Sequence, residues 1–223
     1  MPLSDFGSHD PDFSTEQVAE CARIVDGLRA VGTKVVRLSG SVEELAAAAD
    51  AIEALSASLD AVTQRRAMET FRYRFDREEP NSVMPFNPAT GAFNPVAPKL
   101  EMRLEGGKLV STLAFPENYE SAPDSVQGGM VAACFDQFLA FAVMARGRTG
   151  PTVSLTVHFV KRTPINQPLR FESWVEAVDG EKFSVRGTCF HGGMKVSEAE
   201  ALILGNFPLP VVAGAGKGSS STD

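Results

Sequence analysis

The feature that most constrains the fold is an apolar stretch from Gly129 to Ala145, in which Asp136 and Gln137 are the two strongly polar residues. An amphipathic helix needs one covering surface, whereas a helix that is apolar on nearly all sides needs protein around its whole circumference. A transmembrane helix needs about 20 residues, and a charge at mid-bilayer costs about 2.5–3.5 kcal/mol. We therefore expect a buried helix and no membrane span.

Strand patterns lie on both sides of this stretch. Two alternating segments precede it and four follow it, at about 100–104, 109–115, 153–159, 171–178, 183–190 and 196–204. Tight turns are predicted at Gly106-Gly107, Asp179-Gly180 and Gly192-Gly193, and strands joined by tight turns pair antiparallel. The sequence therefore predicts an α+β architecture, an antiparallel β-sheet wrapped around one long central helix.

Residues 1–75 indicate an N-terminal helical extension. Capping boxes are predicted at Ser14-Thr15-Glu16-Gln17 and Ser41-Val42-Glu43-Glu44, and helical spacing after the second predicts one long helix ending near Phe71. Residues 76–98 are a proline-rich connector, expected to lie against the next domain because Phe86, Phe93 and Val96 are too apolar for a free linker. Residues 99–207 then form the main domain, and residues 208–223 a disordered tail.

Composition excludes several function classes. The formal net charge of −7 gives no basic footprint for nucleic acid, so an anionic ligand must be met by local cations. Cys21, Cys134 and Cys189 are far apart and lack metal-ligand or redox spacing, which indicates reduced thiols in a cytosolic protein. The first residues lack the pattern of a signal peptide. We expect a cytoplasmic location, with no metal and no cofactor.

Several short motifs then fall in one order. They are Asn94-Pro95-Val96-Ala97-Pro98-Lys99-Leu100 before the first strand, Gln127-Gly128-Gly129 at the helix start, Asp136 within the helix, Thr152 opening the next strand, and Lys161-Arg162-Thr163-Pro164 closing it. From about Asn94 to Gly205 the chain resembles the hotdog-fold thioesterase superfamily, in particular the PaaI-like and THEM4-like acyl-CoA thioesterases. The resemblance implies a hotdog fold, a homo-oligomer and hydrolysis of acyl-CoA to a free acid and coenzyme A.

The helix start fits the electrophilic half of that chemistry. A helix N-terminus offers unpaired N–H groups and a positive dipole end to a developing oxyanion, so we expect the Gly129 N–H to be the oxyanion donor. Gly128 lets the substrate approach the backbone closely. Gln127 stands where the family usually has His, as a possible amide donor. A literal His191-Gly192-Gly193 lies in an expected hairpin and is a turn signal only.

Asp136 fits the other half, either as general base on water or as nucleophile. The resemblance gives Thr152 the role of positioning the carboxylate or the water. Gly129 and Asp136 are seven residues apart, about 10.5 Å along one helix, so one helix cannot bring both to one carbonyl. We therefore expect each site to be shared between two subunits of a dimer. Lys161 and Arg162 are candidates for binding the phosphates of coenzyme A.

Each assignment has a structural alternative. Asp136 is alternatively a buried structural carboxylate, Thr152 an ordinary strand residue, Gln127 a loop amide in water, and Lys161 with Arg162 a solvated strand end. Two functional alternatives also remain. One is a catalytically weak hotdog protein that binds an acyl or aromatic ligand, since Gln127 replaces His. The other is a structural dimer whose N-terminal helices bind a partner.

Overall fold

The computed structural model of the chain describes residues 14–63 and 75–212. Within them the helices are α1 (Thr15–Val35), α2 (Val42–Asp60) and α3 (Gly128–Met144), with short 3-10 turns η3 (Pro80–Val83) and η4 (Glu117–Tyr119). The strands are β1 (Phe75–Asp76), β2 (Leu100–Glu105), β3 (Lys108–Leu113), β4 (Glu120–Ala122), β5 (Ser125–Val126), β6 (Arg148–Thr149), β7 (Thr152–Phe159), β8 (Leu169–Asp179), β9 (Lys182–His191), β10 (Met194–Leu204), β11 (Phe207–Pro208) and β12 (Val211–Val212). None of the helices in these ranges is long and apolar enough to cross a membrane.

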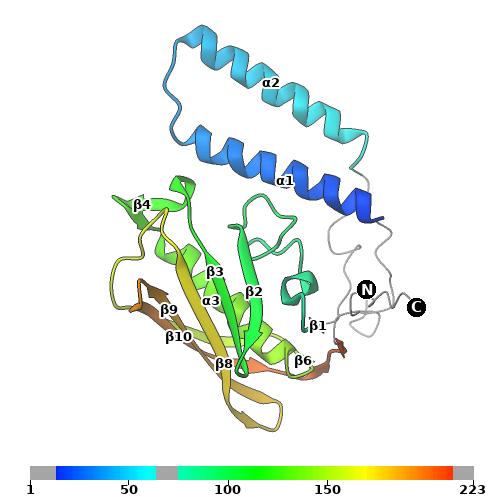
Figure 1. Cartoon of the computed structure of the whole chain (residues 1–223), viewed down its shortest axis with the longest axis vertical. Coiled ribbons are helices and arrows are strands. Elements are labelled where there is room, and N and C mark those ends of the chain that lie inside the picture. Colours follow the sequence, from blue (N-terminus) through cyan, green and yellow to red (C-terminus); the bar gives the residue numbers. More distant parts are fainter. Residues whose placement is uncertain (1–13, 64–74, 213–223) are drawn as a thin grey trace, which may run out of the picture.

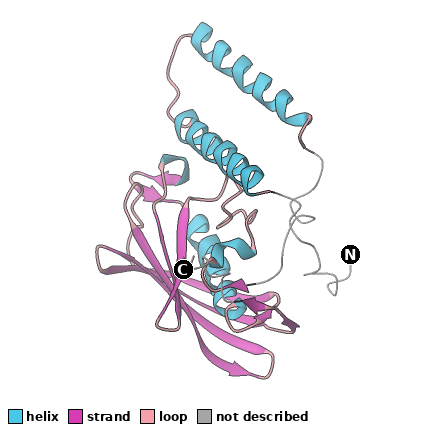
Figure 2. Ribbon diagram, turned by 45° about the vertical axis from the view of Figure 1, so that its right-hand side comes forward, coloured by secondary structure: helices cyan, strands magenta, loops and turns pink. Residues whose placement is uncertain are grey.

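The main sheet has the order β2-β3-β8-β9-β10-β7, and every neighbouring pair is antiparallel. The sheet curls around α3, as Figures 1 and 2 show. Glycines with positive φ make the expected turns at Gly106-Gly107 and Gly192-Gly193. The β8–β9 turn lies one residue later than expected, at Gly180-Glu181, because Asp179 pairs with Lys182. The predicted α+β architecture is confirmed.

The core lies between the concave face of the sheet and α3. Phe135 and Phe138 of α3 both pack against Phe171 of β8, with ring centroids 5.1 Å apart in each pair. All three rings are almost completely buried. Gly187 on β9 leaves room for this packing, because a Cβ there would lie 3.1 Å from the Phe135 ring. The apolar composition of the central helix therefore serves this packing.

The N-terminal helices begin as predicted. Ser14 and Ser41 each form a complete capping box, with Gln17 and Glu44 respectively. Figures 1 and 2 show α1 and α2 side by side and antiparallel, with α1 next to the rest of the molecule. No residue of α2 is buried.

Two boundaries differ from the sequence-based expectation. The second helix ends at Asp60 rather than near Phe71, and the Thr63 hydroxyl donates a hydrogen bond of 2.9 Å to the Leu59 carbonyl there; residues 64–74 lie outside the described ranges. The expected disordered tail from Pro208 is wrong for residues 208–212. Leu209 is buried, and Val211 pairs with Phe75 in a parallel contact between β1 and β12. Each of these two strands has two residues, which is too few for an alternating sequence pattern to predict a strand.

Candidate active site

Gln127 is the N-cap of α3. Its side-chain Oε1 accepts a hydrogen bond of 2.9 Å from the Met130 N–H, and its own backbone N–H donates to the Tyr119 carbonyl at 2.8 Å. Capping is usually done by Ser, Thr, Asp or Asn, so this role was not predicted for a glutamine. Because the cap uses the carbonyl end of the amide, the amide NH₂ is the end left for an external acceptor.

Gly128 and Gly129 are the first two residues of α3. Their N–H groups have no acceptor within the helix, and they bond none elsewhere in residues 14–63 and 75–212. Gly129 is exposed. A Cβ at Gly129 would lie 2.8 Å from Gln127 Oε1, and one at Gly128 would lie 3.3 Å from Phe159 Cζ. Glycine at 129 therefore leaves the cap undisturbed and the helix N-terminus open.

Asp136 lies two turns further along the same side of α3. Gly129, Ala133, Asp136 and Ala140 follow the i, i+4, i+7, i+11 spacing of one helix face, and all four are exposed or half-buried. We call these four residues the open strip of α3. The expectation that the helix is covered on all sides is therefore wrong for the single chain, because the sheet curls around only part of its circumference. The Asp136 carboxylate accepts no hydrogen bond from the part of the chain that the structure describes.

Thr152 is separated from the helix mouth. It opens β7, and Phe159 at the other end of β7 is the residue beside Gly128. Seven residues of strand span about 23 Å at roughly 3.3 Å per residue. One chain therefore does not bring Thr152 to the N-terminus of its own α3.

Lys161 and Arg162 are exposed and follow β7. The next residue, Thr163, accepts a hydrogen bond of 2.8 Å through its carbonyl from the Val126 N–H, one residue before the N-cap Gln127. Lys161 and Arg162 are therefore two residues and one residue before a backbone contact with the segment that leads into α3. Lys161 Nζ also lies 3.7 Å from Met194 Sδ.

The remaining sequence signals lie elsewhere. His191-Gly192-Gly193 is the turn between β9 and β10, as expected. His158 lies on the exposed side of β7 and lines a surface hollow with Trp174 and Arg186. Among the described residues there is no group of three or more His, Cys, Asp or Glu side chains able to hold a metal ion.

The sequence analysis missed one contact beside Asp136. Gln137 is 8% exposed, and its Oε1 accepts a hydrogen bond of 2.6 Å from Asn87 Nδ2 in the connector. A second polar residue in an otherwise apolar helix was the available signal, because a buried amide needs partners. Its partner, 50 residues earlier, had no signal in the sequence. The expectation that the connector lies against the main domain is confirmed, although Val96 itself is 58% exposed.

No protein-family model and no curated protein matches the sequence. Among solved structures, a thioesterase superfamily protein matches with a TM-score of 0.72 and 24% identity, over 88% of this chain and 93% of its own. A hypothetical thioesterase from Streptococcus pneumoniae TIGR4, solved with coenzyme A, matches with a TM-score of 0.47 and 15% identity, over 49% of this chain and 90% of its own. A phenylacetic acid degradation-related protein from Ralstonia eutropha JMP134 matches with a TM-score of 0.43 and 25% identity, over 46% and 82%.

The first of these matches defines the class of fold. The chain has the hotdog fold of the thioesterase superfamily, and the resemblance in its sequence is confirmed at the level of the fold. The other two have TM-scores below 0.5, so this conclusion depends on the first. A match over 88% of the chain exceeds what residues 75–212 supply, so it extends into the N-terminal helices.

Proposed function

We propose that this protein is an acyl-CoA thioesterase whose active sites form between two copies of the chain. The observation that carries the proposal is the open strip of α3. It holds an unpaired helix N-terminus at Gly129 and a carboxylate at Asp136, both accessible from outside the single chain. The two are about 10.5 Å apart along the helix, so a second antiparallel copy of the strip would place each Asp136 opposite the other copy's Gly129.

The edge of the sheet supports the same arrangement. β7 is an outermost strand of the main sheet, and Val153 and Phe159 on it are 56% and 54% exposed. An exposed edge strand of eight residues is a template for pairing with another strand. Antiparallel pairing of β7 with a second β7 would place Thr152 of one copy beside Phe159 of the other. Thr152 and Asp136 of one copy would then meet the Gly128-Gly129 mouth of the other.

The reaction at such a site needs no group beyond these residues and water. As base, Asp136 accepts a proton from water while the water oxygen bonds to the thioester carbonyl carbon. The Gly129 N–H, and the NH₂ of Gln127, donate to the oxygen that gains negative charge. The carbon–sulfur bond then breaks, and the thiolate of coenzyme A takes the proton. As nucleophile, Asp136 instead attacks the thioester carbonyl carbon and displaces the thiolate of coenzyme A, forming an anhydride; water then hydrolyses the anhydride to the free acid and restores the Asp136 carboxylate.

Lys161 and Arg162 bind the phosphates of coenzyme A in this proposal. The chain carries a net charge of −7, so it offers no general attraction for a polyanion. These two cations are exposed and attached near the helix mouth by the Val126–Thr163 hydrogen bond.

The test is release of free coenzyme A from a panel of short, long and aromatic acyl-CoA thioesters. We expect turnover by the wild type, loss of at least tenfold in Asp136→Asn, and wild-type rates in Asp50→Asn, the same change on an exposed site of α2. An active Asp136→Asn would show that Asp136 is structural. Tight binding of acyl-CoA without thiol release by the wild type would favour the ligand-binding alternative.

The shared site has its own test. Asp136→Asn and Gly129→Pro subunits, each nearly inactive alone, should recover part of the activity when mixed, because one of the two sites then has both an intact Gly129 and an intact Asp136. If mass spectrometry confirms mixing and no activity returns, the site is not divided in this way.

A further inference from the structure

The connector folds into a compact loop, residues 84–97, which we call the connector loop. Asn87 organises it, since its Oδ1 accepts hydrogen bonds from the Ala89 N–H at 2.8 Å and from the Thr90 N–H at 3.2 Å. Gly91 N donates to the Asn87 carbonyl at 2.8 Å, and a Cβ at Gly91 would lie 2.4 Å from Asn87 N. Thr90 is fully buried. These contacts hold the loop in a compact turn around the Asn87 side chain.

The inner side of the connector loop holds α3 at the turn that carries Asp136. Asn87 Nδ2 donates to Gln137 Oε1 at 2.6 Å, and Gln137 Nε2 lies 3.2 Å from Met84 Sδ. The Cys134 thiol lies 3.5 Å from the Ala89 carbonyl oxygen. Gln137 follows Asp136 directly and points to the covered side of the helix. These contacts fix the rotation of the turn from which Asp136 projects on the open strip.

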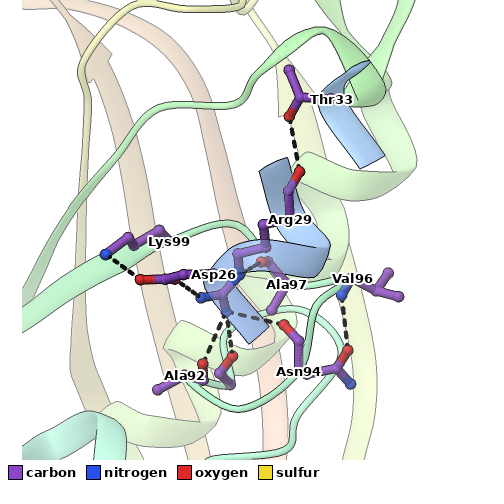
Figure 3. A network of polar contacts seen from close by, with 9 residues as sticks. Asp26, Arg29, Thr33, Ala92, Asn94, Val96, Ala97 and Lys99 are labelled. Atoms are coloured by element: carbon purple, nitrogen blue, oxygen red, sulfur yellow. Dashed lines mark hydrogen bonds and ion pairs between the residues drawn. The ribbon is translucent and has the colours of Figure 1, made fainter. Parts of the chain in front are cut away.

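The outer side of the loop is held by Arg29 of α1. Its guanidinium donates to four backbone carbonyls of the loop, Gly91, Ala92, Asn94 and Ala97, at 3.0–3.1 Å (Figure 3). Arg29 also pairs with Asp26 at 3.1 Å, and Asp26 pairs with Lys99 at 2.8 Å. The Arg29 side chain is 16% exposed, so these charge-assisted bonds are largely shielded from water.

The same loop is also connected to the mouth of α3. The Val96 carbonyl accepts a hydrogen bond of 2.6 Å from the Tyr119 hydroxyl. The Tyr119 carbonyl in turn accepts from the backbone N–H of the N-cap, Gln127, at 2.8 Å. The connector loop therefore contacts the turn of α3 next to Asp136 directly, and it reaches the N-cap Gln127 through Tyr119.

We propose that Arg29 and the connector loop form a clamp that positions Asp136 and the N-terminus of α3 at Gly129, with the Asn87–Gln137 hydrogen bond setting Asp136. The clamp rests on the proposed function. Asn87, Gln137 and Arg29 are positioning residues here, since none of them lies on the open strip. Such a clamp holds the Asp136 carboxylate in position relative to the thioester. A misplacement of a reacting group by about 1 Å can cost roughly 100-fold in rate. The α1 helix is then part of the active-site scaffold.

The experiment compares kcat and KM for acyl-CoA in full-length variants. Gln137→Met keeps the length and burial of the side chain but removes both amide contacts, and Arg29→Ala removes the outer contacts. We expect kcat to fall about tenfold to 100-fold in each, with KM little changed. Arg23→Ala on the same helix, whose side chain is 79% exposed, is the matched control and should keep the wild-type kcat.

A second measurement separates positioning from loss of structure. In an Asp136→Asn background, Gln137→Met should reduce the residual rate no further, because the clamp acts on that rate through Asp136. A further loss of tenfold in that background, or a wild-type kcat in both Gln137→Met and Arg29→Ala, would overturn the clamp.

Hydrogen exchange makes the clamp testable even if no acyl-CoA is turned over. Arg29→Ala should raise amide exchange in residues 84–97 and in the α3 turn around Cys134–Phe138, and leave β9 and β10 unchanged. Unchanged exchange in both segments would overturn the clamp whether or not the protein is a thioesterase.

Discussion

Burial decides which residues of this chain are chemically reactive. Cys134 and Cys189 are both fully buried in the core, and Cys21 on α1 is half-buried. Desolvation by burial raises the pKa of the Cys134 thiol to about 12, and it raises the pKa of the Cys189 thiol to about 12 as well. The thiolate is the reactive form, so these two side chains belong to the packing rather than to the chemistry.

We expect only Cys21 to react with a thiol reagent in the folded protein at pH 8. At a pKa of about 12, roughly one thiol in 10,000 is ionised at that pH, and burial also blocks access. Mass spectrometry after labelling should find one modified cysteine in the native protein and three after unfolding. Native labelling in a Cys21→Ser variant would contradict this expectation.

Gln127 combines two roles that substitutions can separate. Gln127→Ala removes both the capping oxygen and the amide donor, and should lower stability by about 1 kcal/mol, the usual cost of a lost N-cap. If the NH₂ contacts the oxyanion, the rate should also fall by about 100- to 1,000-fold. Gln127→Ser keeps a good capping oxygen without the donor, so it should retain stability and lose the rate.

Thermal unfolding and kcat/KM of the same preparations check this prediction. Gln127→His, which restores the residue usual at this position in the family that the chain resembles, should be tolerated or improved. If Gln127→Ser has the wild-type rate, Gln127 is a cap only, and Gly129, Asp136 and Thr152 carry the chemistry.

At the scale of elements, α3 and β7 each leave one side unsatisfied. The sheet covers most of α3 but not the open strip, and β10 pairs only one side of β7. Small residues at Ala133 and Ala140 make the strip flat enough for close approach of another helix. The two elements are therefore where a second copy of the chain would complete the fold.

If the proposed dimer forms through β7, Val153→Lys on that strand should give a monomer and abolish the proposed thioesterase activity. A lysine at a strand edge disfavours pairing with another strand, and an isolated chain has no second Asp136 to face its Gly129. Val178→Lys on β8 is the matched control, since Val178 is 55% exposed and Val153 is 56% exposed. Light scattering and acyl-CoA turnover should show a change in the first variant and none in the second.

At the scale of the whole molecule, a few polar contacts attach α1 to the hotdog domain. Besides Arg29, the Asp26–Lys99 pair joins α1 to the residue before β2. Two residues after the end of α1, Arg37 Nη1 lies 3.6 Å from Glu117 Oε1. The hydrogen bond from Lys99 is the largest cause that holds the pKa of the Asp26 carboxyl below its usual value of 3.8. Desolvation of Asp26 acts in the opposite direction.

This shift gives a pH dependence with a definite sign. Because the folded-state pKa of Asp26 is lowered, its stabilisation is present above the unfolded value of 3.8 and is lost as pH falls through the lower folded value. The melting temperature should therefore fall more steeply below pH 4 in the wild type than in Asp26→Asn. Since Asp26 is 47% exposed, we expect a small difference, and parallel curves would show that the pair contributes nothing.

The sequence by itself determined the central helix, the antiparallel sheet around it and the two capping boxes, because apolar periodicity, glycine turns and cap residues act over a few neighbouring residues. It also separated Gly129 from Asp136 by seven residues, about 10.5 Å along one helix, which is too far for both to act on one carbonyl. Only the tertiary structure decided that β7 is an edge strand of the main sheet, that the second helix ends at Asp60 and that residues 211–212 pair with residues 75–76. The same holds for Arg29 and Asn87. Arg29 binds backbone carbonyls, which every residue carries, and Asn87 meets Gln137 across 50 residues, so no local pattern distinguishes either contact before the chain has folded.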